Sequence, residues 1–324
     1  MMYNLLKAIF SVGGRDMTFR KVIKSIGSAL MYFGIYMAWQ FAVAFIAAFA
    51  VMMAMAVGAG VDMAAQMAQS GTQYSYDEVF EAAMELEMSI AEDASAWLLE
   101  HTVLLTLIAG VLTLATYALI FALRKKNIFR EVGLAKMPVL PCFGMVILGA
   151  ALNLAVSYVL TLVPFPEAWW TEQAAQSELL LGAEPWLTIL LSVILAPILE
   201  EVVFRGLVHS RLKRSMPMLA SMIISAWLFG LMHVSIIAVI YASLLGFLLA
   251  WVMEKYKSLL APMLVHFGFN LCAVVLDMFE DIPTLVCIAA RAVSVIGIVV
   301  VQMRSKNKIE FAFAKDVPSQ DENQ

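Results

Sequence analysis

Charge is scarce along this sequence. Of its 324 residues, only 14% are Asp, Glu, Lys or Arg, whereas 62% are hydrophobic. Soluble domains are about a quarter charged and about half apolar. A soluble fold could not keep this much apolar surface away from water, so the composition predicts that lipid is the solvent for much of the chain.

Several motifs that carry chemistry in other proteins are also missing. Cys142, Cys272 and Cys287 each lie in an apolar stretch without C-x-x-C spacing, so we interpret them as small buried hydrophobes. The zinc-protease helix motif H-E-x-x-H is absent. Lys and Arg form no basic stripe, so nucleic acid is not an expected partner. Membrane lipid is the first partner that the composition predicts.

Long apolar runs are abundant instead. A hydrocarbon core of about 30 Å needs roughly 20 apolar residues per helix. The sequence therefore predicts an all-α, polytopic transmembrane helical bundle of about eight spans. The first follows a basic N-terminal segment and, at about 29 residues, is too long for the core of a signal peptide, so we expect it to stay uncleaved. The expected spans are Ser28–Val57, Trp97–Leu123, Met137–Val163, Pro185–His209, Met216–Val234, Ser235–Met253, Leu259–Met278 and Pro283–Met303.

The placement of charge supports this count. Lys and Arg gather in cytoplasmic loops of membrane proteins. Basic and acidic or neutral loops alternate along all eight spans, which predicts that both termini lie in the cytoplasm. The boundary between the fifth and sixth spans is the least marked, because 231–247 holds no charge or proline. The basic segments are the N-terminal arm, 124–130, 211–214, 255–257 and 304–308. The acidic segments are 58–96, 164–184 and 278–282.

The chain is expected to form one domain with cytoplasmic ends. Residues 1–27 are predicted as a cytoplasmic N-terminal arm, 28–303 as the membrane domain and 304–324 as a cytoplasmic tail. Within the membrane domain, 58–96 is an outer loop rich in Ala, Met, Gln and Glu, which favour helix. We expect a surface helix there, which is either a solvated cap or a gate for substrate.

Three of the expected spans hold a set of polar residues that fits together, and an ionisable residue within a span costs about 2.5–3.5 kcal/mol on insertion scales. The fourth span contains Glu200, Glu201 and Arg205, the fifth contains Phe229 and His233, and the seventh contains His266 and Asn270. Each of these residues therefore requires a structural or functional reason.

Helical spacing divides these residues into pairs. Glu201 and Arg205 are four residues apart, so they share a face and can form an ion pair. Glu200 lies about 100° further round the helix and stays free to face another helix. His266 and Asn270 also share one face. The fourth and fifth spans form a hairpin that places Glu200 and His233 at matching heights, roughly 24–26 Å from its turn. His266 lies roughly 11 Å into its span. It reaches the same depth as Glu200 and His233 if the basic end of the hairpin projects about 10–15 Å beyond the bilayer.

This set of side chains predicts hydrolysis of a peptide bond. Glu200 is the candidate general base for water, His233 can orient that water and deliver a proton, and His266 and Asn270 can donate to an oxyanion. In a second version, Zn²⁺ binds His233, His266 and Glu200, and a metal-bound water is the nucleophile. We favour the version without a metal or other cofactor.

At these residues the chain resembles the CPBP family, also called Abi or CAAX-protease-like, which includes the type II CAAX prenyl proteases. The family pattern is E-E-x-x-x-R, then F-x-x-x-H, then H-x-x-x-N, and all three motifs are intact here within residues 185–278. The resemblance implies that Glu200, His233, His266 and Asn270 are catalytic, and that Glu201 with Arg205 holds the helix in place.

The resemblance also implies a partner and a location. The expected substrate is a membrane-associated, possibly prenylated, peptide or protein, and the expected location is the cytoplasmic membrane of a bacterium, with the active site open to the cytoplasm. One alternative is a non-catalytic membrane protein that uses the same polar cluster for binding, as a bacteriocin-immunity factor, a scaffold or a transporter. A transporter would more often show a repeated half, which this sequence lacks.

Overall fold

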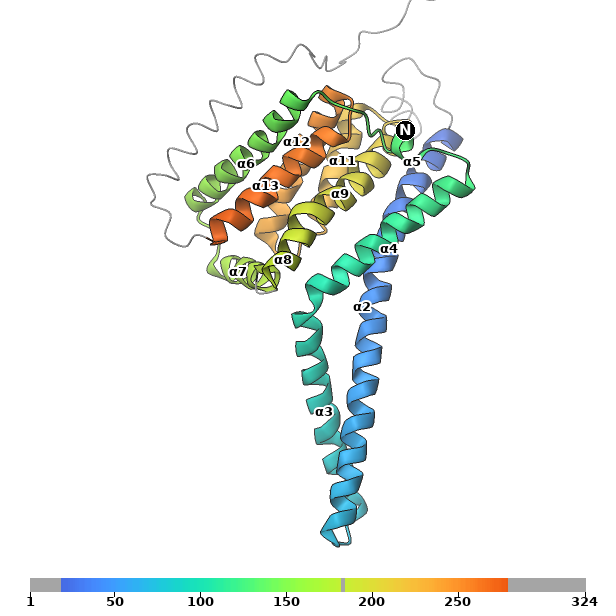
Figure 1. Cartoon of the computed structure of the whole chain (residues 1–324), viewed down its shortest axis with the longest axis vertical. Coiled ribbons are helices and arrows are strands. Elements are labelled where there is room, and N and C mark those ends of the chain that lie inside the picture. Colours follow the sequence, from blue (N-terminus) through green and yellow to red (C-terminus); the bar gives the residue numbers. More distant parts are fainter. Residues whose placement is uncertain (1–18, 182–183, 279–324) are drawn as a thin grey trace, which may run out of the picture.

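The structure is a computed structural model that describes residues 19–181 and 184–278, and every element in that part of the chain is helical (Figure 1). The first half comprises α2 (Phe19–Ser70), α3 (Tyr76–Glu100), α4 (Thr102–Leu123), α5 (Ile128–Glu131), α6 (Val139–Leu162) and α7 (Glu167–Leu181). One continuous helix follows, made of α8 (Pro185–Thr188), η1 (Ile189–Leu195), α9 (Ala196–Glu200), η2 (Glu201–His209) and α10 (Ser210–Leu212). The last are α11 (Met218–Gly230), α12 (Ile236–Tyr256) and α13 (Leu260–Met278).

Six of these helices are long and apolar enough to cross a membrane. They are α2, α4, α6, the helix 185–212, α12 and α13. The predicted fifth span is shorter than expected, because α11 has 13 residues and is about 20 Å long. The predicted separation of the fifth and sixth spans is confirmed, since a turn at 231–235 precedes α12 and the Ser235 hydroxyl accepts a hydrogen bond from Ala238 N. The predicted eighth span and the tail 304–324 lie outside the described residues, as does most of the predicted N-terminal segment 1–27.

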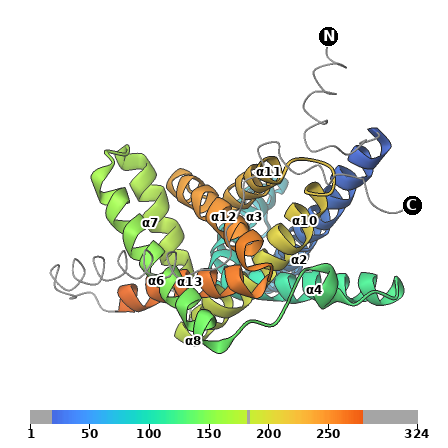
Figure 2. The ribbon, with the colours of Figure 1, turned by 90° about the horizontal axis from the view of Figure 1, so that it is seen from above.

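The first span differs most from its prediction. Helix α2 does not end near Val57 but continues to Ser70, so its 52 residues extend about 78 Å. A turn with Gly71 at a positive φ of 65° follows, and Ser75 and Glu78 form a reciprocal cap at the start of α3. The distal part of α2 and the whole of α3 form a two-helix hairpin, residues 58–100, which projects from the helical body (Figure 1) and lies behind it when the molecule is seen from above (Figure 2). We call this hairpin the arm. The helix that we predicted for 58–96 is therefore present.

The body contains a very close crossing of α6 and α13 (Figure 1). A Cβ atom added to Gly149 would lie 1.9 Å from the Val265 carbonyl oxygen, and one added to Gly268 would lie 2.1 Å from that of Val146. Glycine thus allows the two backbones to touch, as small residues do where membrane helices pack. Because Gly268 lies between His266 and Asn270, this contact also fixes the position of both polar side chains.

We expect Gly268→Ala to lower the free energy of unfolding by about 1–3 kcal/mol, because the α6 backbone must move to admit the methyl group. Gly58→Ala is the matched control, since Gly58 is helical and has nothing within 4 Å of an added Cβ. The control should be neutral or up to about 1 kcal/mol more stable. Unfolding of both variants in mixed micelles measures the difference, and equal stability of the two would contradict this account of the crossing.

The basic end of the body is held together by Glu131 in the short helix α5. Its carboxylate lies 2.9 Å from Lys126 Nζ, 2.9 Å from an Arg211 nitrogen and 4.0 Å from an Arg214 nitrogen. The Lys126 hydrogen bond, followed by that of Arg211, holds the pKa of Glu131 below its usual range. Two segments that are distant in sequence, 126–131 and 211–214, are therefore joined by one ionised carboxylate.

This network predicts a pH-dependent contribution to stability. Because folding lowers the pKa of Glu131, the stabilisation is complete above the ordinary pKa of about 4.3 and is lost as the pH falls through the lowered value. At pH 7, Glu131→Gln should lower the melting temperature by about 2–4 °C. The gap between wild type and variant should narrow below about pH 4.3. Glu167→Gln, an exposed change on α7, serves as the control and should leave the melting curve unchanged at both pH values.

Candidate active site

The helix 185–212 carries the site and is irregular for a clear reason. Pro197 lacks a backbone N–H, and the residue five positions earlier in the π-helical segment η1 is Ser192. Asn270 on α13 fills the gap, because its Nδ2 donates to the Ser192 carbonyl oxygen at 2.7 Å. Helices with π-helical turns are common at functional sites. Here the irregular turn ties α13 to the helix that carries Glu200.

The predicted ion pair of Glu201 and Arg205 is present and fully buried. Arg205 Nη1 donates to Glu201 Oε1 at 2.7 Å, and Nη2 donates to the Gly246 carbonyl oxygen of α12 at 3.0 Å. The guanidinium carbon lies 4.3 Å from the centre of the Phe229 ring. Both side chains are 0% exposed. The pair therefore joins η2 to α11 and α12, which is the supporting role expected from its spacing.

His266 lies between two carboxylates, and the sequence predicted only one of these neighbours. Its Nδ1 is 3.0 Å from Glu201 Oε1, and its Nε2 is 3.7 Å from Glu200 Oε2. Because a carboxylate only accepts, the Nδ1 proton donates to Glu201 and fixes the orientation of the ring. Nε2 is left facing Glu200. Glu201 thus orients His266 in addition to pairing with Arg205.

The predicted fifth span placed His233 on a helix, but the structure does not. His233 lies in the turn after α11, where its Nδ1 is 3.2 Å from the Phe229 carbonyl oxygen. The Phe229 ring is 5.2 Å from the His233 ring and 5.7 Å from the His266 ring, centre to centre, and is edge-on to both. The two imidazoles are therefore brought together around one aromatic side chain.

Helix α7 holds the turn that carries His233. Ser235 N donates to Gln176 Oε1 at 3.2 Å, and the Ser235 hydroxyl donates to Gln173 Oε1. No pattern in the sequence indicated these contacts, because residues 164–184 were expected only as an acidic loop. The turn, and with it His233, depends on a helix outside the motif-bearing spans.

The open side of the cluster is at Glu200. The side chain of Glu200 is 22% exposed, whereas those of Glu201 and His266 are 0% and 4% exposed. His233 and Asn270 are half-buried. Glu200 is therefore the carboxylate on the open side of the cluster, and Glu201 is buried behind His266.

The zinc arrangement is not assembled by these residues. Within residues 19–181 and 184–278, no group of three His, Cys, Asp or Glu side chains lies close enough to hold a metal ion. The set of His233, His266 and Glu200 is thus not gathered into a metal site in this conformation, and no step below involves a metal.

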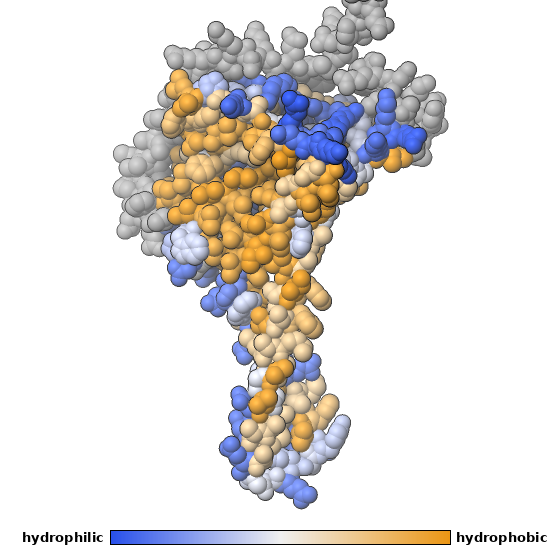
Figure 3. All heavy atoms as spheres, turned by 45° about the vertical axis from the view of Figure 1, so that its right-hand side comes forward, coloured by the Kyte–Doolittle hydropathy of each residue, from blue (hydrophilic) through white to orange (hydrophobic). Residues whose placement is uncertain are grey.

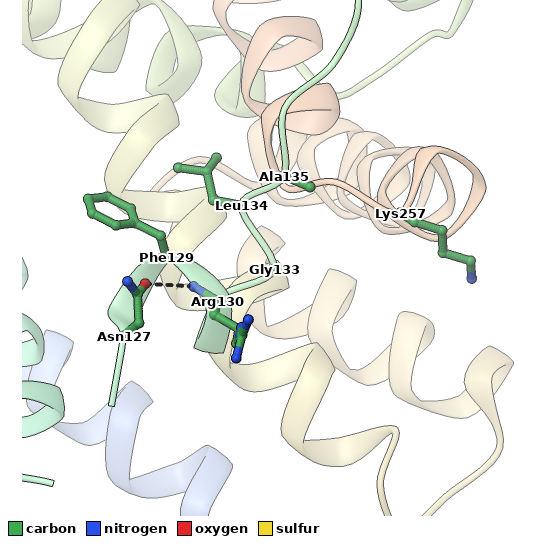
Figure 4. A pocket seen from close by; sticks show the side chains of 7 residues that line it. All are labelled: Asn127, Phe129, Arg130, Gly133, Leu134, Ala135 and Lys257. Carbon is green, nitrogen blue, oxygen red and sulfur yellow. Dashed lines mark hydrogen bonds between the residues drawn. The ribbon is translucent and has the colours of Figure 1, made fainter. Parts of the chain in front are cut away.

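A separate cavity of about 650 Å³ lies at the basic end of the body (Figure 4). It is lined by Asn127, Phe129, Arg130, Gly133, Leu134, Ala135 and Lys257. None of these residues belongs to the acid–imidazole cluster. The cavity is therefore distinct from the candidate active site.

The fold and the cluster together define a class of protein: a helical membrane protein with a carboxylate and two imidazoles gathered between its spans. Residues 182–272 match the family described as "Type II CAAX prenyl endopeptidase Rce1-like". This segment is a domain of that family, and it contains every residue of the predicted site. The helices α2 to α6 and most of α7 lie outside the match.

A curated relative agrees with the family match. The chain is 27% identical over 92 residues to a protein of Bacillus subtilis (strain 168) named "Putative membrane peptidase YdiL". The aligned part covers 28% of this chain and 38% of that relative, so the chain spans well under half the length of the relative that it matches. No solved structure gives a significant match.

Proposed function

We propose that this protein is an intramembrane endopeptidase that hydrolyses peptide bonds of a membrane-associated protein or peptide. The observation that carries the proposal is the position of Glu200, which faces His266 Nε2 at 3.7 Å, on the open side of a buried polar cluster. The cluster lies inside a segment that belongs to a peptidase family. A purely structural ion pair would need only Glu201 and Arg205, and would leave no role for Glu200 or His233.

In the proposed reaction, the Glu200 carboxylate removes a proton from a water molecule, and the oxygen of that water attacks the scissile carbonyl carbon. The C=O bond becomes an oxyanion, which is stabilised by donors that already lie in place. The proposed donors are the Asn270 N–H that does not bind Ser192 and, in the imidazolium form of His266, its Nε2–H, because the Nδ1–H is already donated to Glu201. The C–N bond then breaks, and the proton held by Glu200 passes to the leaving amine. His233 orients the water, and no oxidant or metal is consumed.

We further propose eight spans, with both termini and the opening of the site on the cytoplasmic side. Support comes from the relative depth of two helices. A Cβ atom added to Gly206 would lie 3.4 Å from Leu259, so the helix 185–212 continues about 9 Å beyond the start of α13. The basic residues of 211–214 occupy this extension, as positively charged cytoplasmic loops do. His266 then lies about 9 Å into α13, in the cytoplasmic half of the bilayer.

The test is cleavage by the purified protein of matched peptides, prenylated and unprenylated, with products identified by mass. We expect cleavage of at least one peptide, at a rate unchanged by a chelator. A rate that falls with chelator and returns with Zn²⁺ would contradict the metal-free mechanism. If no peptide is cleaved and a peptide still binds with the same affinity to Glu200→Gln, the non-catalytic alternative replaces the endopeptidase.

A further inference from the structure

We infer that the arm stands outside the membrane, because the next candidate span begins where the arm ends. Helix α4 is a candidate span whose first residue is Thr102, and only His101 separates it from the last residue of α3. Helix α3 has 25 residues and leads away from this boundary for about 37 Å (Figure 1). The distal part of α2 runs beside it in the opposite direction. The arm is therefore surrounded by water and not by lipid.

The arm nevertheless exposes apolar side chains. Its two helices touch through a narrow contact face on α3, formed by Ala82, Leu86, Ile90 and Ala94, of which only Ala94 is fully buried. Large apolar residues lie outside that face: Tyr76 is 80% exposed, Met88 is 72% exposed and Phe80 is 54% exposed. Val61, Val79 and Met84 are exposed as well. Space-filling shows these apolar patches along the arm, interrupted by polar ones (Figure 3). An extended apolar surface in water is typical of a binding face.

All formal charge on the arm is negative. Residues 58–96 contain Asp62, Asp77, Glu78, Glu81, Glu85, Glu87, Glu92 and Asp93, and no Lys or Arg. Glu81, Glu85 and Glu92 share one face of α3 with Met88, because they are spaced by four and seven residues. In the described part of the chain, none of these carboxylates forms an ion pair with a cation. The exposed methionine thus lies within a row of unneutralised carboxylates.

The exposed apolar side chains and the negative charge limit which partners can bind the arm. A second copy of the arm would bring like charges together, which is destabilising. An anionic lipid surface would also be repelled. We propose that the arm is a docking surface for a basic, amphipathic peptide segment of a partner, whose apolar side covers Met84 and Met88 and whose cations pair with the carboxylates of α3. This inference goes beyond the peptidase activity and does not depend on it.

The test uses the full-length protein in nanodiscs of zwitterionic lipid. The probe is a fluorescent 18-residue Lys/Leu amphipathic peptide, with a Glu/Leu peptide of the same pattern and empty nanodiscs as references. We expect saturable binding of the Lys/Leu peptide alone, weakened by salt. Glu81→Gln, Glu85→Gln and Glu92→Gln together should weaken it about tenfold, since each exposed pair contributes a fraction of that change.

A matched variant carries Glu167→Gln, Glu172→Gln and Glu178→Gln on α7, which removes the same charge from exposed positions elsewhere. It should bind the peptide within twofold of wild type. Equal weakening by both triple variants, or equal binding of both peptides, would overturn the proposal. So would a wild-type dimer in detergent that dissociates on Met84→Ser with Met88→Ser, because the face would then belong to a second copy. All of these changes are on exposed helix surface, and circular dichroism checks that the helices persist.

Discussion

Glu200→Gln is expected to reduce the rate of peptide cleavage by about two to four orders of magnitude, with little change in stability or membrane insertion. The glutamine amide has the same shape but cannot remove a proton from water. The contact of this carboxylate with His266 Nε2 is 3.7 Å long, which is beyond hydrogen-bond distance, so the substitution breaks no strong contact there. The measurement is single-turnover cleavage of a peptide that wild type cleaves, with substrate binding measured separately.

Two control variants test whether the loss of cleavage is specific to Glu200. Glu100→Gln, an exposed change beside the boundary of α4, should cleave at the wild-type rate. Glu201→Gln should lose activity together with stability, because Glu201 holds both Arg205 and His266. If Glu200→Gln retains cleavage within about twofold while it is correctly inserted, Glu200 is not the general base. The polar cluster would then require a different mechanism.

The residues within one helix were predictable, and the contacts between helices were not. The spacing of Glu201 and Arg205 sets their common face wherever the helix lies, so the ion pair followed from the sequence alone. The contact of Glu201 with His266 depends on the rotation and depth of α13 against η2, which no local pattern specifies. Asn270 was expected to serve only as an oxyanion donor, whereas one of its protons binds the Ser192 carbonyl that Pro197 leaves unpaired.

The length of α2 shows a second limit of sequence reasoning. Hydropathy alone ends the predicted first span near Val57, where apolar residues give way to polar ones. The residues beyond, rich in Ala, Met and Gln, continue the same helix because they also favour helix in water. Hydropathy therefore set the predicted end of the span, and helix propensity decided where the helix ends. The difference between the two is the α2 part of the arm.

Arg205→Met is expected to lower the free energy of unfolding by about 3–5 kcal/mol, the cost of leaving one member of a buried ion pair without its partner. Glu201 would lose its cationic partner in a site that is 0% exposed, and one of its oxygens already lacks a hydrogen-bond partner. Arg205→Lys should recover only part of the loss, because an ammonium cannot reach Glu201 and the Gly246 carbonyl in the planar geometry of the guanidinium. Unfolding in mixed micelles measures each variant.

The double variant Glu201→Gln with Arg205→Met separates stability from orientation. Removing both charges should restore most of the stability, since a buried pair replaced by neutral residues of similar volume is often no less stable. Cleavage should stay low, because a glutamine carbonyl holds the His266 ring more weakly than a carboxylate does. Recovery of both stability and cleavage would mean that Glu201 serves only Arg205. Recovery of stability alone would assign the orientation of His266 to the buried carboxylate, which places both glutamates of the motif in the reaction, one at the water and one behind the imidazole.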